Sequence, residues 1–408
     1  MSSSLNNDQK KAFDLIVSSF PSRKPCFICG KAGTGKSYLI ECLKNYFKTI
    51  NAPFVITAST GIASILIGGR TLHSAFAIFS EDGKYHSGLS TDKPNGKAMT
   101  LCEVLFVDEV TMLTKDIFEL VDKKLREIRA QVKGDRSYLD MPFGGVMVIL
   151  TGDLCQVPCV TKDSSDVNEF NEMFNNMPLF KLFHVKTLQE LMRQNDNHSP
   201  FITLLESVRN YKDGTQLPIE CIELLKNHFM EISSHEQYFD IYSFIGDDGM
   251  AIFYTNKSCD KYNDTIVKEL AKLNEQVLLH NEGSLIAVHK TSYVHGNDFS
   301  CERNPAPEYD KKLYKSFLKS RDSQSLVPYD FIFFIGARVM LLKNIDSSTG
   351  LVNGRRGIIT DVLQDETTGK IHGISVNFDA ISTFDEQEEL IHMIKVDSFR
   401  RTNGKILN

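Results

Sequence analysis

The chain has 408 residues, with 46 Lys and Arg against 52 Asp and Glu, so its formal net charge is −6. Hydrophobic residues make up 42% and charged residues 24%, a balance that favours two or three folded domains and excludes a disordered tail, a collagen-like repeat and a coiled coil. No apolar run approaches a membrane span, and residues 1–9 lack a secretory pattern, so we expect an intracellular protein. The acidic balance argues against coating nucleic acid through bulk charge, whereas a local basic groove stays open.

The nine cysteines are scattered along the chain, which is typical of reduced thiols and not of a disulfide framework. Cys26 and Cys29 form one close pair, and Cys155 and Cys159 form another, so a zinc site has to be weighed. Both pairs lie in apolar, strand-like stretches, where neighbouring side chains point to opposite faces. This placement disfavours a shared metal ion.

The first half of the chain alternates short β-rich runs with helical patterns, which indicates a parallel sheet wrapped by helices. We expect strands at 26–29, 54–57, 104–107 and 146–151, and helices at 9–18, 36–47 and 115–130. The polar stretch 80–97 is expected to be an excursion from this sheet.

The pattern restarts after residue 178. Helices are expected at 201–211, 219–229 and 258–273, and strands at 251–254, 338–342, 357–361 and 371–378. Residues 281–329 are polar and irregular, which indicates a large insertion. The last strands alternate with glycine-containing turns, and this favours a small β-barrel.

Residues 30–37 read Gly-Lys-Ala-Gly-Thr-Gly-Lys-Ser and fit the phosphate-loop pattern G-x-x-x-x-G-K-[ST] at every position. The segment follows an apolar strand and opens a helix, a context in which backbone N–H groups wrap phosphate oxygens. We expect the Lys36 ammonium to reach the β- and γ-phosphates and the Ser37 hydroxyl to coordinate Mg²⁺. The predicted nucleotide-binding residues of this loop are Gly30, Ala32, Gly33, Thr34, Gly35, Lys36 and Ser37.

Residues 104–109 form an apolar strand that ends in two acids. A carboxylate at the tip of such a strand lies beside the phosphate loop, so Asp108 is expected to hold the magnesium ion. Glu109 is then placed to orient or deprotonate the attacking water. Together the two motifs predict hydrolysis of a nucleoside triphosphate, with phosphoryl transfer to a small acceptor as the alternative.

In its ordered motifs the chain resembles the Pif-type, RecD-related DNA helicases of superfamily one, which move 5′ to 3′. The motifs that carry the resemblance lie at residues 5–9, 55–63, 68–74, 142–145, 151–158, 188–194, 255–263, 339–344 and 350–354. The resemblance implies ATP and Mg²⁺ as cofactors and single-stranded DNA as the partner. It also implies a role in DNA repair, recombination or replication, in the nucleus or at another site of replication.

The resemblance assigns roles to individual residues. It implies that Gln9 bonds the adenine edge, that Gln156 senses the γ-phosphate, and that Arg193 stabilises charge on the transferred phosphoryl group. The implied DNA contacts are Thr57, Ser59, Thr60, His73 and Asn256. The local patterns also allow a capped helix start before Gln9, a surface position for Arg193 and a helix cap at Asn256.

The implied fold is α/β, with two RecA-like domains and a small barrel. The N-terminal RecA-like ATPase domain is expected at 1–185, with a small wedge excursion at 80–98. A second RecA-like domain is expected at 186–356, and an SH3-like β-barrel insertion at 357–400. The T-x-H-x-x-Q-G and Y-V-A-x-[ST]-R patterns with which family members continue are absent from this sequence. We therefore expect an incomplete second domain and weak hydrolysis by the chain alone.

Three interpretations stay open. The first is an ATP-driven DNA helicase or translocase, for which a partner chain is expected to supply the missing part. The second is a partial or degenerate helicase that binds ATP and DNA without unwinding. The third is a P-loop nucleotide kinase, which would leave residues 152–158 unexplained.

Overall fold

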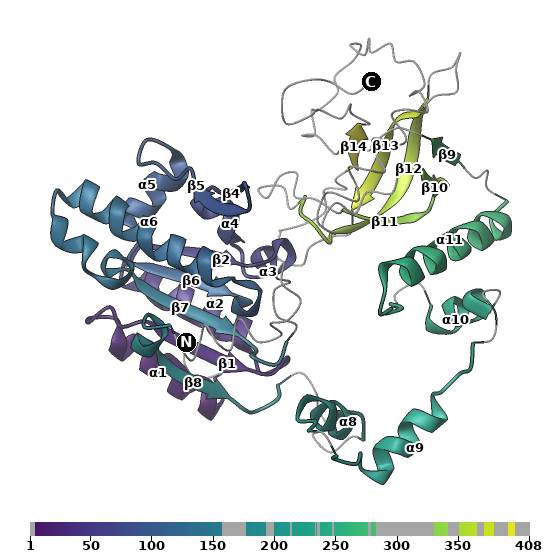
Figure 1. Cartoon of the computed structure of the whole chain (residues 1–408), viewed down its shortest axis with the longest axis horizontal. Helices are drawn as coiled ribbons and strands as arrows, with labels where there is room; N and C mark the ends of the chain where they lie inside the picture. Colours follow the sequence, from purple (N-terminus) through teal and green to yellow (C-terminus); the bar gives the residue numbers. More distant parts are fainter. Residues whose placement is uncertain are drawn as a thin grey trace. The chain divides into compact units, whose positions relative to one another are not determined.

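The computed structural model of the protein describes residues 5–156, 177–192, 200–212, 214–232, 234, 237–246, 249–275, 279–282, 330–341, 351–364, 371–378 and 391–395. The chain divides into two compact units, Met1–His228 and Phe229–Asn408. Figure 1 shows the helices and strands of both units and labels most of them.

A six-stranded parallel sheet forms the centre of the first unit (Figure 1), in the order β3-β2-β6-β7-β1-β8. The strands are β1 (Cys26–Gly30), β2 (Phe54–Ala58), β3 (Arg70–Thr71), β6 (Val104–Asp108), β7 (Met147–Gly152) and β8 (His184–Leu188). The four strands predicted for this half of the chain are confirmed to within one residue at each end. The two edge strands were not predicted: β3 is only two residues long, and β8 is polar and half exposed.

Helices cover both faces of this sheet (Figure 1). Helices α1 (Asn7–Ser19) and α2 (Lys36–Thr49) pack on one face, and α6 (Lys115–Lys133) packs on the other. Successive side chains of a strand point to opposite faces, so Phe106 belongs to the core under α1 and α2 while Leu105 and Val107 belong to the core under α6. Burial on both faces explains why these strands read as continuous apolar runs.

Phe106 is a central member of the core beneath α2. It is 1% exposed, and its ring meets those of Phe47 and Phe54 edge-on, each with centroids 6.1 Å apart. Phe106→Ala is expected to destabilise the first unit by about 3–5 kcal/mol, because the sheet cannot close the resulting cavity. Urea unfolding followed by far-ultraviolet circular dichroism measures the loss. Leu101→Ala, at a 68% exposed position, is the control, and an equal shift in both variants would contradict this account.

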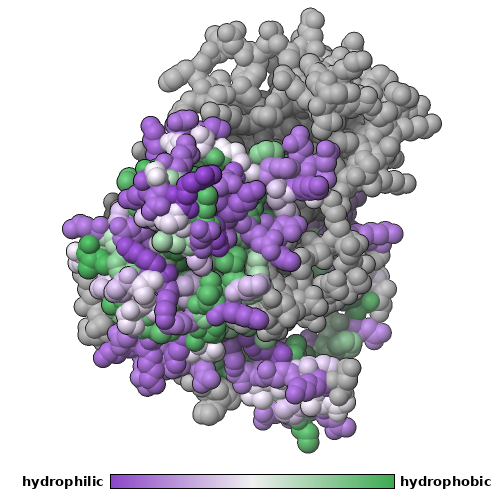
Figure 2. Space-filling view, turned by 60° about the vertical axis from the view of Figure 1, so that its left-hand side comes forward, coloured by the Kyte–Doolittle hydropathy of each residue, from purple (hydrophilic) through white to green (hydrophobic). Residues whose placement is uncertain are grey.

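The polar stretch predicted at 80–97 lies outside the central sheet. It covers the end of β4 (Ile78–Glu81), β5 (Lys84–Ser87) and the start of α5 (Pro94–Leu101). Helix α3 (Gly61–Leu66) precedes β3, and α4 (Leu72–Phe76) follows it. Strands β4 and β5 form an antiparallel hairpin whose turn residues Asp82 and Gly83 have φ values of 51° and 76°. Figure 2 shows one face of the molecule, where hydrophilic residues predominate and small hydrophobic patches lie between them.

Two helices, α8 (Pro200–Arg209) and α9 (Ile219–Asn227), end the first unit. The second unit contains α10 (Tyr238–Ile245), α11 (Asn256–Leu273), β9 (Leu279–Glu282), β10 (Asp330–Phe333), β11 (Arg338–Met340), β12 (Arg356–Gln364), β13 (Ile371–Phe378) and β14 (Ile391–Lys395). Strands β9 and β10 pair with each other, and β11 to β14 form a four-stranded antiparallel sheet. A core that includes Phe333, Ile359 and Val376 lies on this sheet.

The strand predicted at 251–254 is wrong. These residues are not paired with another strand, and Ile252 and Tyr254 are almost fully exposed. An alternating apolar pattern is not enough, because a strand forms only where a neighbour satisfies its backbone groups. The SH3-like barrel, the second RecA-like domain and the predicted domain boundaries stay predictions.

Candidate functional site

Residues 30–37 join β1 to α2 at the carboxyl edge of the sheet. Gly33 and Gly35 have φ values of 84° and 79°, in the left-handed region that side chains disfavour. A Cβ atom on Gly35 would also collide with the side-chain amide of Gln9. The backbone conformation therefore favours glycine at both positions, and a side chain at position 35 would also displace the Gln9 amide.

The loop leaves the start of α2 open for an anion. Gly35 is the N-cap of α2, and no side chain caps the helix. The first N–H groups of a helix have no intrahelical partner and carry positive potential, which suits a phosphate. The Lys36 ammonium donates to the carbonyl oxygens of Gly30 and Lys31, at 2.7 and 3.1 Å, so its charge lies folded over the loop.

The predicted acidic pair ends β6. Asp108 is buried, and its Oδ1 accepts hydrogen bonds from the Thr151 hydroxyl and, at 2.9 Å, from the N–H of Glu109. Glu109 has a left-handed backbone with φ 54°, a strained conformation that gathers at functional sites. Burial raises the pKa of Glu109, the charges of Asp108 and Asp153 raise it further, and Lys36 partly offsets them.

Asp153 follows β7, which lies between β1 and β6, so it sits between the loop and the acidic pair. Arg209 of α8 donates two hydrogen bonds to the Asp153 carboxylate, from Nη1 to Oδ2 at 2.7 Å and from Nη2 to Oδ1. Burial alone would raise the pKa of Asp153. Hydrogen bonds from Arg209 and the Cys155 N–H, with the charges of Arg209 and Lys36, outweigh burial and lower this pKa.

Neither member of this pair was predicted. Asp153 had a sequence signal, since a carboxylate directly after a buried strand is the pattern that identified Asp108. Arg209 had none, because nothing in its local pattern distinguishes it from a solvated arginine at the end of a helix.

Gln9 lies against the phosphate loop and also completes the cap of α1. Its Nε2 donates to the carbonyl of Thr34 at 3.1 Å, and its side chain is buried. Its Oε1 accepts from the N–H of Asn6, whose side chain accepts from the N–H of Gln9. The interpretations as a capped helix start and as a residue beside the nucleotide loop are therefore compatible.

Two further predicted residues, Gln156 and Arg193, lie at or just beyond the ends of described segments of the chain. Gln156 is half-buried, and its N–H donates to the carbonyl of Asp153 at 2.9 Å. Arg193 lies outside the described residues. The residue before it, Met192, contacts the phosphate loop through an N–H donated to the carbonyl of Gly33 at 2.8 Å.

The predicted DNA contacts near β2 differ in their exposure. Thr57 is fully buried, and its hydroxyl donates to the carbonyl of Phe106 at 2.6 Å. The Thr57 hydroxyl is therefore not available to DNA in this structure, because it is already used inside the sheet. Ser59 and Thr60 lie just beyond the strand and are half-buried, and Thr60 caps α3 through the N–H of Ala63.

The other two predicted DNA contacts lie in different units. His73 is half-buried in α4, its ring centroid is 6.4 Å from that of Tyr85, and burial lowers its pKa. Asn256 is the exposed first residue of α11. The interpretation of Asn256 as a helix cap is wrong, because Thr255 caps α11 by accepting from the N–H of Ser258 at 3.2 Å.

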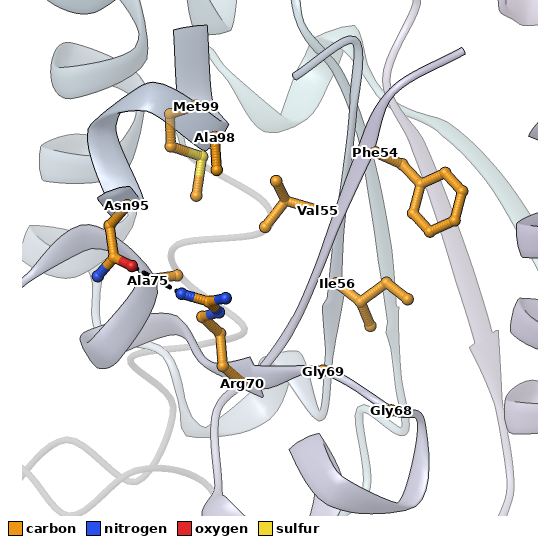
Figure 3. Close-up of a pocket in the computed structure, with 10 residues that line it drawn as sticks. All are labelled: Phe54, Val55, Ile56, Gly68, Gly69, Arg70, Ala75, Asn95, Ala98 and Met99. Carbon is orange, nitrogen blue, oxygen red and sulfur yellow. Dashed lines mark hydrogen bonds between the residues drawn. The ribbon is translucent and has the colours of Figure 1, made fainter. Parts of the chain in front are cut away.

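A pocket of about 340 Å³ lies at the other end of the sheet, beside β2 and α5 (Figure 3). Arg70 lines it and donates from Nη1 to the Oδ1 of Asn95 at 2.6 Å, across from Met99 and Val55 (Figure 3). None of the lining residues is among the individually predicted site residues, although Val55, Ile56 and 68–70 belong to the motifs at 55–63 and 68–74.

The cysteines do not form a metal centre in the described part of the chain, where no three His, Cys, Asp or Glu side chains gather as ligands. Burial raises the pKa of Cys26 to about 11 and also raises that of Cys29. Cys155 is exposed, and Cys159 lies outside the described residues. Among the helices that are described, none is both long and apolar enough to cross a membrane.

Comparison with known proteins assigns this site to a family. The family model for PIF1-like helicases matches residues 4–214, more than half of the chain. The chain belongs to the PIF1-like helicase family. A second model, for the 2B domain of DNA helicase Pif1, matches residues 317–362.

Curated relatives support the PIF1-like assignment. The uncharacterized protein 030L of Invertebrate iridescent virus 6 is 31% identical over 369 residues, which cover 87% of this chain and 63% of the relative. The ATP-dependent DNA helicase PIF1 of Xenopus laevis is 28% identical over 348 residues, and that of Homo sapiens 30% over 336 residues. These matches cover 85% and 82% of this chain but only 46% and 43% of the relatives. The chain therefore spans less than two thirds of these relatives' length.

Solved structures support the same fold. A structure of two coordinating Pif1 helicases at forked double-stranded DNA has a TM-score of 0.60 and 25% identity, and the match covers 98% of this chain and 78% of that one. Bacteroides Pif1 bound to single-stranded DNA has a TM-score of 0.58, 24% identity and the same coverage. The resemblance to PIF1-like helicases and the α/β RecA-like fold are thereby confirmed.

Proposed function

We propose that this chain is an ATP-driven DNA helicase or translocase that moves 5′ to 3′ on single-stranded DNA. The observation that carries the proposal is the meeting of Lys36, Asp108 and Glu109 at one edge of the sheet, between strands that belong to a PIF1-like fold. The named activity of the relatives PIF1 of Xenopus laevis and Homo sapiens supports ATP as the nucleotide.

The residues of the site fit a nucleotide with its magnesium ion. The uncapped start of α2 and the Lys36 ammonium provide donors for phosphate oxygens, while Ser37 and Asp108 provide oxygen ligands that Mg²⁺ prefers. When bound, Mg²⁺ neutralises charge on the phosphates. In this proposal Gln9 contacts the base, Glu109 takes the proton of the attacking water, and Gln156 and Arg193 respond to the γ-phosphate.

Single-stranded DNA is proposed to lie along the ends of β2 and α4, with Ser59, Thr60 and His73 as contacts and Asn256 as a contact from the second unit. Half-buried hydroxyl groups next to backbone N–H groups suit phosphates, and such contacts read no sequence. The structure of Bacteroides Pif1 with single-stranded DNA supports this class of ligand. A role in replication, repair or recombination, in the nucleus or at another replication site, belongs to the same proposal.

Affinity for single-stranded DNA is expected to fall about tenfold between about 50 and about 200 mM salt, and to vary less than about threefold between base sequences. His73→Ala is expected to weaken binding further, because it removes a contact beside the strand. Thr57→Val is the matched control and should leave affinity unchanged, since that hydroxyl is buried. Fluorescence anisotropy with labelled oligonucleotides measures each value, and a salt-independent affinity would count against this interface.

A steady-state ATPase assay with and without single-stranded DNA, followed by unwinding of a 5′-tailed duplex, tests the proposed function. A helicase shows DNA-stimulated hydrolysis and strand separation. A degenerate helicase binds ATP and DNA but shows neither hydrolysis nor strand separation. Because no partner chain is added, strand separation in this assay would contradict the prediction that a partner is needed. The family match does not support the nucleotide kinase alternative, which predicts phosphoryl transfer to a nucleotide acceptor.

A further inference from the structure

Helix α8 touches two loops of the candidate nucleotide site through ion pairs. Glu206 pairs with Lys31, which lies inside the phosphate loop, and Arg209 pairs with Asp153 at the end of β7. Residues three positions apart share one face of a helix, so the two pairs act side by side. The same face of α8 is thus attached to both loops.

The two ion pairs differ in burial, and the more buried pair is expected to couple α8 more tightly to its loop. The side chain of Asp153 is 3% exposed and that of Arg209 is 22% exposed, whereas Lys31 and Glu206 are 33% and 45% exposed. A buried carboxylate without its partner is costly, and a two-pronged guanidinium contact fixes orientation as well as distance. A movement of Asp153 must therefore carry Arg209, and with it α8.

The loop partners of α8 also meet Lys36. The carbonyl oxygen of Lys31 accepts from the Lys36 ammonium at 3.1 Å and from the Thr34 hydroxyl at 2.9 Å. The charge of Lys36 also acts on Asp153. When the ammonium turns toward phosphate oxygens, the Lys31 carbonyl loses one donor and Asp153 loses a nearby positive charge, so Asp153 depends more on Arg209. Glu206 binds the side-chain ammonium of Lys31, so its ion pair responds only when the loop itself moves.

We propose that α8 is a nucleotide-responsive element, in which Arg209 and Glu206 are positioning residues that transmit the state of the phosphate loop and of Asp153 to the helix. The inference rests on the proposed function only in requiring that a nucleotide binds this loop. The chain continues from α8 through α9 to the second unit, which begins at Phe229, so a change in α8 acts on the segment that connects the units.

Hydrogen exchange of peptides that cover residues 200–212 tests the inference without requiring hydrolysis. With saturating Mg²⁺ and a non-hydrolysable ATP analogue, we expect exchange in α8 of the parent chain to slow by about fivefold, because the ion pair between Asp153 and Arg209 tightens. Arg209→Gln should reduce this effect to less than about twofold. Arg209→Lys keeps the charge opposite buried Asp153 but loses the two-pronged contact, and should give an intermediate response.

Two further variants separate a specific contact from a general loss of charge or fold. Glu206→Gln breaks the exposed pair alone and should lower the response partly, while Lys212→Gln removes an exposed positive charge three residues after Arg209 and should leave it intact. Binding of a fluorescent ATP analogue is measured in the same samples. Binding to the parent without any change in α8, or an undiminished change in Arg209→Gln, overturns the inference. A parent chain that binds no nucleotide overturns the proposed function and the inference with it.

Discussion

Lys36→Ala is expected to abolish ATP hydrolysis by this chain, with a fall of about 10²–10³-fold or more in turnover. The Lys36 ammonium lies over the phosphate loop, where it donates to the carbonyl oxygens of Gly30 and Lys31. Alanine removes the charge that would hold the β- and γ-phosphates while their negative charge shifts during cleavage. Release of inorganic phosphate under saturating ATP, with and without single-stranded DNA, measures the effect.

Lys48→Ala is the matched control for this variant. Lys48 lies on the same helix, α2, and is exposed at its far end, so its removal changes net charge equally without touching the loop. Circular dichroism verifies that both variants fold. Turnover by folded Lys36→Ala equal to that of the parent would show that the phosphate loop is not the site of hydrolysis.

Glu109→Gln is expected to bind ATP like the parent and to cleave it about 10²–10⁴-fold more slowly. The carboxamide has nearly the shape of the carboxylate but cannot accept the proton of the attacking water. Glu109 adds negative charge to a site that already holds Asp108 and Asp153 beside Lys36. Because phosphates are also negative, loss of the Glu109 charge should not weaken nucleotide binding. Equilibrium binding of a fluorescent ATP analogue and single-turnover hydrolysis separate the two steps.

The control for the second variant is Glu119→Gln on the exposed side of α6, where the carboxylate forms only a long ion pair with Lys115 at 3.9 Å. This change should leave both binding and turnover as in the parent. Equal loss of binding and turnover in Glu109→Gln would mean that the residue holds the nucleotide and does not act as the base.

The motifs of the site were predictable from the sequence because their chemistry depends on contiguous residues. A loop with glycines at two left-handed positions, followed by Lys36 and a helix, specifies its own conformation. An apolar run that ends in Asp108 and Glu109 specifies a buried strand with acids at its tip. Alternation of such runs with helices is enough to predict a parallel sheet, whose carboxyl edge brings both motifs together.

Only the tertiary structure determined which hydroxyls and charges are available. Thr57 follows the same local pattern as Ser59, yet its hydroxyl is used inside the sheet, because burial depends on which strands flank β2. The strand predicted at 251–254 found no partner for the same reason: pairing is a property of neighbours distant in sequence. Asp153 and Arg209 are joined by a fold that returns α8 to the end of β7, and no local pattern encodes a contact across that separation.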